Sequence, residues 1–154
     1  MKMDTTRFGE IEIVDEFVFD FAGPIIGFDD YHKYILIDYD ENSCFKWLQS
    51  MDNPNLAFPV TAASFFNIDY QFEISDENAD LIGLKSADEL LVLNIATIPS
   101  QNPENTTLNL RAPIIINTVN NKAMQIILSN DSFKIKHPIF AKQEKEVEAG
   151  MLKD

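Results

Sequence analysis

Residues 107–128, which read TLNLRAPIIINTVNNKAMQIIL, contain the pattern that decides the fold. Two apolar runs flank an Asn-rich segment, and this arrangement is typical of two β-strands joined by a turn. Because proline has no backbone N–H, Pro113 predicts a strand edge or a bulge. Asn109 and Arg111 have the same parity as Pro113 and should share its face, while Asn117 can end the strand by capping its own backbone. These polar groups indicate an irregular seam in a β structure, and the alternative is that the seam borders a binding site.

Alternation of apolar and polar residues extends well beyond this stretch. Its clearest instance is residues 66–74, where five apolar residues alternate with four polar ones. This pattern predicts a strand with one buried face and one wet face. Further apolar or alternating segments that predict strands are residues 10–13, 17–21, 34–37, 45–50, 56–61 and 90–98. We therefore expect a mainly β fold, a small, largely antiparallel, barrel-like single domain or sandwich.

One short helix interrupts the β pattern. Ser75 can cap a helix start, and Asp76 and Glu77 place negative charge in its first turn. Gly83 suits the C-terminal stop. The sequence thus predicts a helix between Ser75 and Gly83.

Length, charge and cysteine content limit the classes of protein. With 154 residues the chain suits one domain, which we place at 1–140, followed by a charged tail, 141–154, that should be frayed or disordered. The net charge of −13 disfavours direct binding of nucleic acid or an anionic membrane and favours basic partners. Cys44 is the one cysteine, as expected in a reducing compartment. With no signal-peptide pattern and no apolar run of ~20 residues, we expect a cytoplasmic protein.

Residue patterns that carry catalysis or bind metals are not found. The two histidines, His32 and His137, lie in no recognisable nucleophile motif. Residues 38–42, DYDEN, resemble the start of a calcium loop, but Ser43 stands where that loop needs Gly and Gln49 where it needs Glu. The five glycines are scattered and form no phosphate-binding loop. By elimination we expect a binding protein rather than an enzyme, with no metal and no cofactor.

Four stretches, in order along the chain, carry a family resemblance. The first is FVFDFAGPIIGF at 17–28, and the second is LQSM at 48–51 followed by LAF at 56–58. The third is Asp69-Tyr70 at the end of a short loop. The fourth lies within residues 107–128 and has the form T-x-N-x-x-A-P-I-x-I-N at 107–117, followed by Q-x-I-L at 125–128. With this pattern the chain resembles the flagellar assembly factor FliW family from near its N-terminus to about Phe140. The turn GPIIGF and the loop Ala62-Ala63-Ser64 depart from the commoner family forms.

The resemblance implies a cytoplasmic, non-enzymatic protein with a compact barrel-like fold and two protein partners. One partner is CsrA, a small RNA-binding repressor of translation, and the other is flagellin. Holding CsrA relieves repression of flagellin messenger RNA, and free flagellin competes for FliW. Family knowledge favours docking beside the RNA site of CsrA over occupation of that site. Because of the two departures, a dedicated flagellin-binding chaperone without CsrA antagonism stays an alternative, and a small-ligand barrel or unrecognised enzyme is a third.

Eight residues are our candidates for contacts with these partners. An outward Phe65 would anchor a partner, although burial under a loop is the alternative. The other candidates are polar or charged residues that ordinary solvation would also explain. They are Asn67, Asp69 and Gln71 on the wet face of residues 66–74, Arg111 in the seam, and Asp38, Asp40 and Glu41 in the acidic loop. We expect Arg111 either to pair internally or to bind a carboxylate of a ligand.

Overall fold

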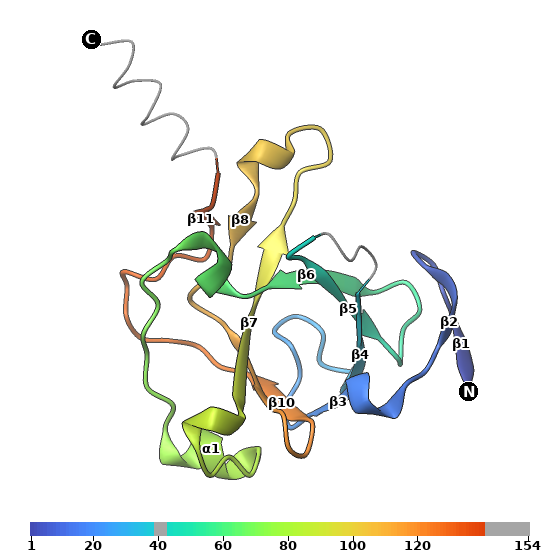
Figure 1. The fold of residues 1–154 in the computed structure, drawn as a ribbon, viewed down its shortest axis with the longest axis horizontal. Helices are drawn as coiled ribbons and strands as arrows, with labels where there is room; N and C mark the ends of the chain where they lie inside the picture. The colour runs from blue at the N-terminus through green and yellow to red at the C-terminus, as the bar shows by residue number, and fades with distance from the viewer. Residues whose placement is uncertain (39–42, 141–154) are drawn as a thin grey trace.

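Seven strands close into a barrel in the computed structural model, which describes residues 1–38 and 43–140 (Figure 1). The strand order is β7-β6-β5-β4-β3-β10-β9, and β9 pairs back with β7 to complete the circle. The barrel strands are β3 (Val18–Phe21), β4 (Lys33–Ile37), β5 (Lys46–Ser50), β6 (Ala57–Thr61), β7 (Leu90–Thr97), β9 (Ile114–Asn117) and β10 (Lys122–Gln125).

Neighbouring barrel strands are antiparallel, except that β10 runs parallel to β3. The closing pair joins segments far apart in sequence, with Leu90 opposite Asn117 and Leu93 opposite Ile114. This arrangement confirms the prediction of a mainly β, largely antiparallel barrel.

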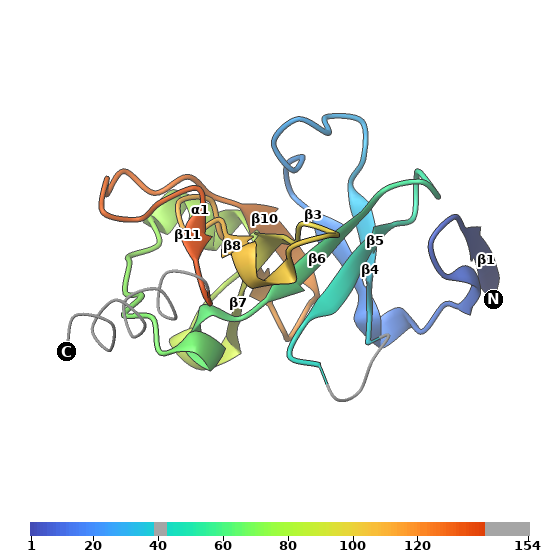
Figure 2. The ribbon, with the colours of Figure 1, turned by 90° about the horizontal axis from the view of Figure 1, so that it is seen from above.

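Four short strands lie outside the barrel circle. β1 (Lys2–Thr5) and β2 (Gly9–Glu12) form a separate antiparallel hairpin, while β8 (Thr107–Leu108) and β11 (His137–Pro138) extend the sheet beyond β7. Trp47 of β5 contacts the hairpin, because the Arg7 guanidinium carbon lies 4.3 Å from its ring centroid. In both views of the ribbon the hairpin is at one end of the molecule and β11 is at the other (Figures 1 and 2).

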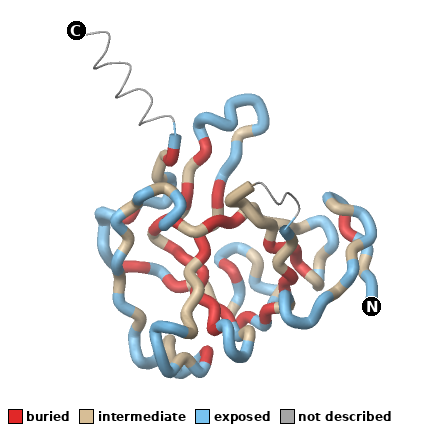
Figure 3. Tube along the Cα trace, in the orientation of Figure 1, coloured by how far each residue is buried: buried red, intermediate tan, exposed pale blue. Residues whose placement is uncertain are grey.

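Two apolar cores lie on the two sides of β9, because Ile114 and Ile116 belong to the first and Ile115 to the second. Figure 3 shows which segments of the chain are buried. The first includes Phe19, Tyr34, Leu48 and Ile116 from the barrel strands. The second lies outside β7 and β9 and includes Ile82, Leu110 and Phe133. The second core is covered by residues 66–75, which we call the strap, and residues 129–139, which we call the arm.

The predicted helix is confirmed as α1 (Asp76–Leu81). The Ser75 side chain accepts a hydrogen bond from the Asn78 backbone N–H at 3.1 Å, and Gly83 follows with a φ of 66°. Among the described residues, the remaining elements are four 3₁₀ turns: η1 (Asp15–Phe17), η2 (Ala63–Phe66), η3 (Ala87–Glu89) and η4 (Pro103–Asn105).

The strand predicted over residues 66–74 is wrong. η2 ends at Phe66, Asn67 adopts a left-handed φ of 54°, and the rest of the strap forms no strand pairing. Its side chains nevertheless alternate between half-buried and exposed, and the inward ones pack on the second core. Alternation of apolar and polar residues therefore indicates an extended segment that covers a core. A β-strand also needs a neighbouring strand to pair with its backbone N–H and C=O groups.

The seam predicted in the opening stretch is confirmed, but it divides the first expected strand into β8 and β9. Asn109 Oδ1 accepts hydrogen bonds from the backbone N–H groups of Arg111 at 3.1 Å and Ala112 at 3.0 Å, which bends the chain between the two strands. Pro113 directly precedes β9. Asn117 caps its own backbone as expected, with Oδ1 accepting from the Val119 N–H at 2.9 Å. Its buried amide also donates to the Ile82 carbonyl at 2.9 Å.

Candidate partner-binding surface

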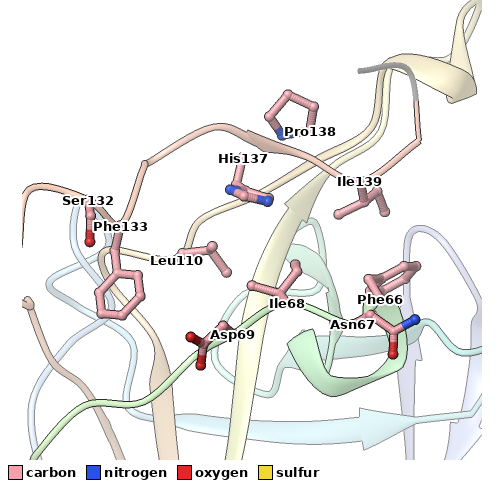
Figure 4. Close-up of a pocket in the computed structure, with 10 residues that line it drawn as sticks. All are labelled: Phe66, Asn67, Ile68, Asp69, Leu110, Ser132, Phe133, His137, Pro138 and Ile139. Atoms are coloured by element: carbon pink, nitrogen blue, oxygen red, sulfur yellow. The ribbon is translucent and has the colours of Figure 1, made fainter. Parts of the chain in front are cut away.

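A hollow of about 500 Å³ lies between the strap and the arm (Figure 4). Asn67 and Asp69 line it from the strap, and Ser132 and Phe133 line it from the arm, with Leu110 between them. His137, Pro138 and Ile139 continue the arm side. Two of the predicted site residues thus reach the same hollow, although they do so from an extended segment rather than from a strand.

A second hollow of about 370 Å³ adjoins the first. Gln71 and Glu73 of the strap line it opposite Asn130 of the arm, and Phe133 lines both hollows. Asp69, Gln71 and Glu73 are all exposed. The strap therefore presents a row of polar and acidic side chains along a groove, which is defined here as these two hollows together.

Phe65 is exposed, as the partner-anchor hypothesis requires. Its relative exposure is 65%, and it lies in η2 directly before the strap. Neighbouring Phe66 is half-buried instead and packs against Phe140 with ring centroids 5.8 Å apart. An exposed Phe beside a groove offers a partner apolar area at little rearrangement cost.

A hydrogen-bond network beneath the groove, which we call the floor, is formed by Tyr70 and Asn94 with the carbonyls of Leu110 and Asn109. The Tyr70 hydroxyl donates to the Leu110 carbonyl at 2.5 Å and accepts from Asn94 Nδ2 at 3.1 Å. The same Asn94 amide donates to the Asn109 carbonyl at 3.0 Å. Burial raises the pKa of Tyr70 to about 12, and the hydrogen bond from Asn94 opposes part of that rise. The floor thus ties the strap to β7 and to the seam between β8 and β9.

Arg111 contacts two residues of the arm and does not line the groove. Its Nε donates to the Phe133 carbonyl at 3.1 Å, and its Nη2 pairs with Asp131 Oδ1 at 3.2 Å. The side chain is 31% exposed and lines a third hollow, of about 330 Å³. Arg111 therefore pairs internally, one of the two roles expected for it, while its contact with a partner stays a prediction.

Asp38, the acidic-loop candidate that the structure describes, lies at one end of the barrel. Asp38 follows β4, and its carboxylate lies 3.1 Å from the Lys46 ammonium. Phe45, next to Lys46, contacts Phe66 with ring centroids 6.0 Å apart, so this end of the barrel adjoins η2. Asp40 and Glu41 lie outside the described residues.

Sequence reasoning missed three exposed isoleucines around the third hollow. They are Ile26, Ile127 and Ile135, with relative exposures of 56%, 68% and 58%. A weak signal was present, because Ile135 stands between Lys134 and Lys136 and an apolar residue in a charged run often faces outwards. Nothing in the sequence alone places these three side chains together, since they come from three separate segments.

The LQS stretch at residues 48–50, one of those that carry the family resemblance, has a structural role. The Gln49 amide, fully buried, donates to the carbonyls of Ser50 at 2.9 Å and Leu56 at 3.0 Å. Ser50 Oγ accepts from the backbone N–H groups of Asp52 at 3.1 Å and Asn53 at 2.9 Å. These residues hold the turn between β5 and β6 and do not approach the groove.

Within the described ranges, 1–38 and 43–140, no group of three or more His, Cys, Asp and Glu side chains is placed to hold a metal ion. No helix in that part of the chain is long and apolar enough to cross a membrane. The three hollows are lined by apolar and polar side chains, and the lining of the first includes Asp69, Ser132 and His137.

The fold and surface define a small closed β-barrel protein with an open groove on its outer face. The FliW family, described as "FliW protein", matches residues 2–139. The chain belongs to the FliW family.

Similar proteins share most of their length with this chain. The flagellar assembly factor FliW of Caldanaerobacter subterraneus is 44% identical over 140 residues, which cover 90% of this chain and 93% of that protein. Its counterpart in Thermoanaerobacter pseudethanolicus is 43% identical over the same shares. A crystal structure of the flagellar assembly factor FliW superposes with a TM-score of 0.83 at 28% identity, covering 91% of this chain and 97% of that one.

Proposed function

We propose that this flagellar assembly factor acts without catalysis, by binding CsrA and flagellin in alternation in the cytoplasm. The observation that carries the proposal is family membership over residues 2–139. Held CsrA cannot repress flagellin messenger RNA, and flagellin that accumulates takes its place. Export of flagellin then frees the factor to bind CsrA again.

Charge supports the CsrA half of the proposal. An RNA-binding protein carries basic surface, and this chain has a net charge of −13. Opposite charges steer two proteins together and raise their association rate. Asp69 and Glu73, both exposed on the strap, are well placed to meet basic residues, and Phe65 would add an apolar anchor.

Exposed apolar surface supports the flagellin half. A segment that is disordered before assembly pays an ordering cost when it binds, so it needs an apolar surface to offset that cost. Ile26, Ile127 and Ile135, all exposed around the third hollow, supply such a surface. Alternation between two ligands needs only an unfavourable coupling between their binding free energies. Adjoining surfaces are one source of such coupling, and Ile127 lines both the third hollow and the second hollow of the groove.

Titration calorimetry with CsrA from the same cell, alone and in excess flagellin, tests the proposal. We expect binding to CsrA that disappears when flagellin is present. Replacing Asp69 and Glu73 by Asn and Gln should weaken CsrA binding, while the matched changes at Asp15 and Glu16 of η1, which line none of the three hollows, should not. Binding to flagellin with no binding to CsrA would instead identify a dedicated flagellin chaperone.

A further inference from the structure

An apolar surface surrounds the third hollow, on the other side of the arm from the first. Ile26, Ile127 and Ile135 all line this hollow and are all more than half exposed. Deeper lining residues continue the apolar character, among them Ile25, Phe58, Ile95 and Ala112. We call this the isoleucine face. Exposed apolar side chains that converge on one hollow are characteristic of an interaction site, whereas scattered ones are ordinary.

The charges at the isoleucine face are opposite in sign to the charge of the whole molecule. The chain has only 12 basic residues against 25 acidic ones. Even so, Arg111 lines the hollow, and Lys134 and Lys136, both exposed, flank Ile135. Asp131 is the acid paired with Arg111, and it is 96% exposed. Such an exposed ion pair is weak and can be exchanged for another carboxylate.

Arg111 has hydrogen-bonding capacity to spare at this face. A guanidinium carries five N–H donors, and those of Arg111 make two contacts with described residues, to Phe133 and Asp131. The side chain is still 31% exposed. A carboxylate that reaches the hollow would find a partly exposed cation beside an apolar cavity of about 330 Å³.

We propose that the isoleucine face binds an amphipathic protein segment that inserts an apolar side chain into the third hollow and places a carboxylate beside Arg111. Building on the proposed function, this assigns the two partners to two faces: flagellin to the isoleucine face, and CsrA to the acidic groove. A basic RNA-binding protein would be repelled by Arg111, Lys134 and Lys136. A second copy of this chain, itself at −13, fits less well than a segment with an apolar stripe and a few carboxylates.

The two faces are physically connected. Ile127 lines both the third and the second hollow, and Phe133 lines both the second and the first. Arg111 contacts the Phe133 carbonyl, so a ligand that draws Arg111 towards itself acts on the wall of the groove. This continuity gives the two partners a means to oppose each other without sharing a contact surface.

Calorimetry on matched variants tests the assignment. In Ile26→Ser and Ile135→Ser, at positions that line the third hollow and neither hollow of the groove, we expect the dissociation constant for flagellin to rise at least tenfold and that for CsrA to stay within twofold. Val119→Ser is the control, because Val119 is 73% exposed on the β9–β10 turn and lines none of the three hollows described here. Loss of CsrA binding in the isoleucine variants, or unchanged binding of flagellin, would overturn the assignment.

A second measurement keeps the inference separate from the proposed function. Methyl spectra of isoleucine-labelled protein are recorded with a synthetic amphipathic helix that carries Leu on one face and Glu on the other, and with its Lys counterpart. The Glu peptide should shift the methyl signals of Ile26, Ile127 and Ile135, and the Lys peptide should not. Equal shifts from both peptides, no shift from either, or shifts that depend only on protein concentration would contradict the inference. If natural CsrA and flagellin both fail to bind while the Glu peptide does, the proposed function fails and the face remains a binding site for this class of segment.

Discussion

Two buried tyrosine hydroxyls have opposite surroundings. That of Tyr70 makes two hydrogen bonds, to the Leu110 carbonyl and from the Asn94 amide. Replacing Tyr70 by Phe removes both bonds, so that the Leu110 carbonyl loses this donor and the Asn94 amide keeps only its bond to the Asn109 carbonyl. We expect the free energy of unfolding to fall by ~1–3 kcal/mol, as is typical when a buried group loses its hydrogen bond. Urea denaturation measures this, and no change would mean that the floor does not hold the strap.

The Tyr34 hydroxyl is buried in the barrel and has no hydrogen-bond partner among the described residues. Its ring packs against Phe21 with centroids 5.0 Å apart, and a Phe at this position keeps that contact. Tyr34→Phe should therefore raise the free energy of unfolding by up to ~1 kcal/mol, because it removes the cost of burying an unpaired polar group. A fall comparable with that of Tyr70→Phe in the same urea series would contradict this account.

The same two tyrosines predict how stability depends on alkaline pH. Burial raises the pKa of each from its ordinary value of 10.0 to about 12, with Asp52 adding to the rise at Tyr34. The folded state therefore holds these protons more tightly than the unfolded state does. Their contribution is complete below about pH 10 and is lost between pH 10 and pH 12, at up to ~1.4 kcal/mol per pH unit for each group. Urea titrations from pH 8 to 11 should show this decline, and it should be smaller in Tyr34→Phe.

At the scale of elements, one asparagine joins the helix to the barrel. Asn117 ends β9, and its amide donates to the Ile82 carbonyl at the end of α1, as does that of Asn120 at 3.0 Å. Asn117 is 1% exposed and Asn120 is exposed. Asn117→Ala should lower the free energy of unfolding by ~2 kcal/mol, since the Val119 N–H also loses its acceptor. Asn120→Ala is the control, with an expected loss of less than ~1 kcal/mol in the same denaturation assay; equal losses would contradict the special role of Asn117.

Elements with local signals were predictable from sequence. The cap at Ser75 and the stop at Gly83 each depend on residues close together in the chain. The strap was misassigned because Ile68, Tyr70 and Phe72 alternate as in a strand, yet no neighbouring strand is available for their backbone. The periodicity of the sequence identified which side chains of the strap face the core. It does not identify a partner strand, because strand pairing depends on other segments of the chain.

At the scale of the whole molecule, closure of the barrel was beyond sequence reasoning. It depends on β7 pairing with β9 and on β10 lying parallel to β3, contacts between segments about 25 and 100 residues apart. The candidate surface shows the same limit. Asn67, Asp69 and Gln71 were found because they share one segment, whereas the isoleucine face joins residues from three segments.

The net charge of −13 predicts a salt-dependent encounter with CsrA. Because exposed charges are screened over ~10 Å at 0.1 M salt, we expect the association rate constant to fall about tenfold between 50 and 500 mM salt. Dissociation should change much less, since it depends on contacts already formed. Stopped-flow fluorescence with labelled CsrA measures both rates. Removing Asp69 and Glu73 should flatten the salt dependence more than removing Asp15 and Glu16 of η1, because local charge at the groove guides docking while both pairs change net charge equally. An equal effect of the two pairs would mean that the whole molecule attracts CsrA and the groove does not orient it.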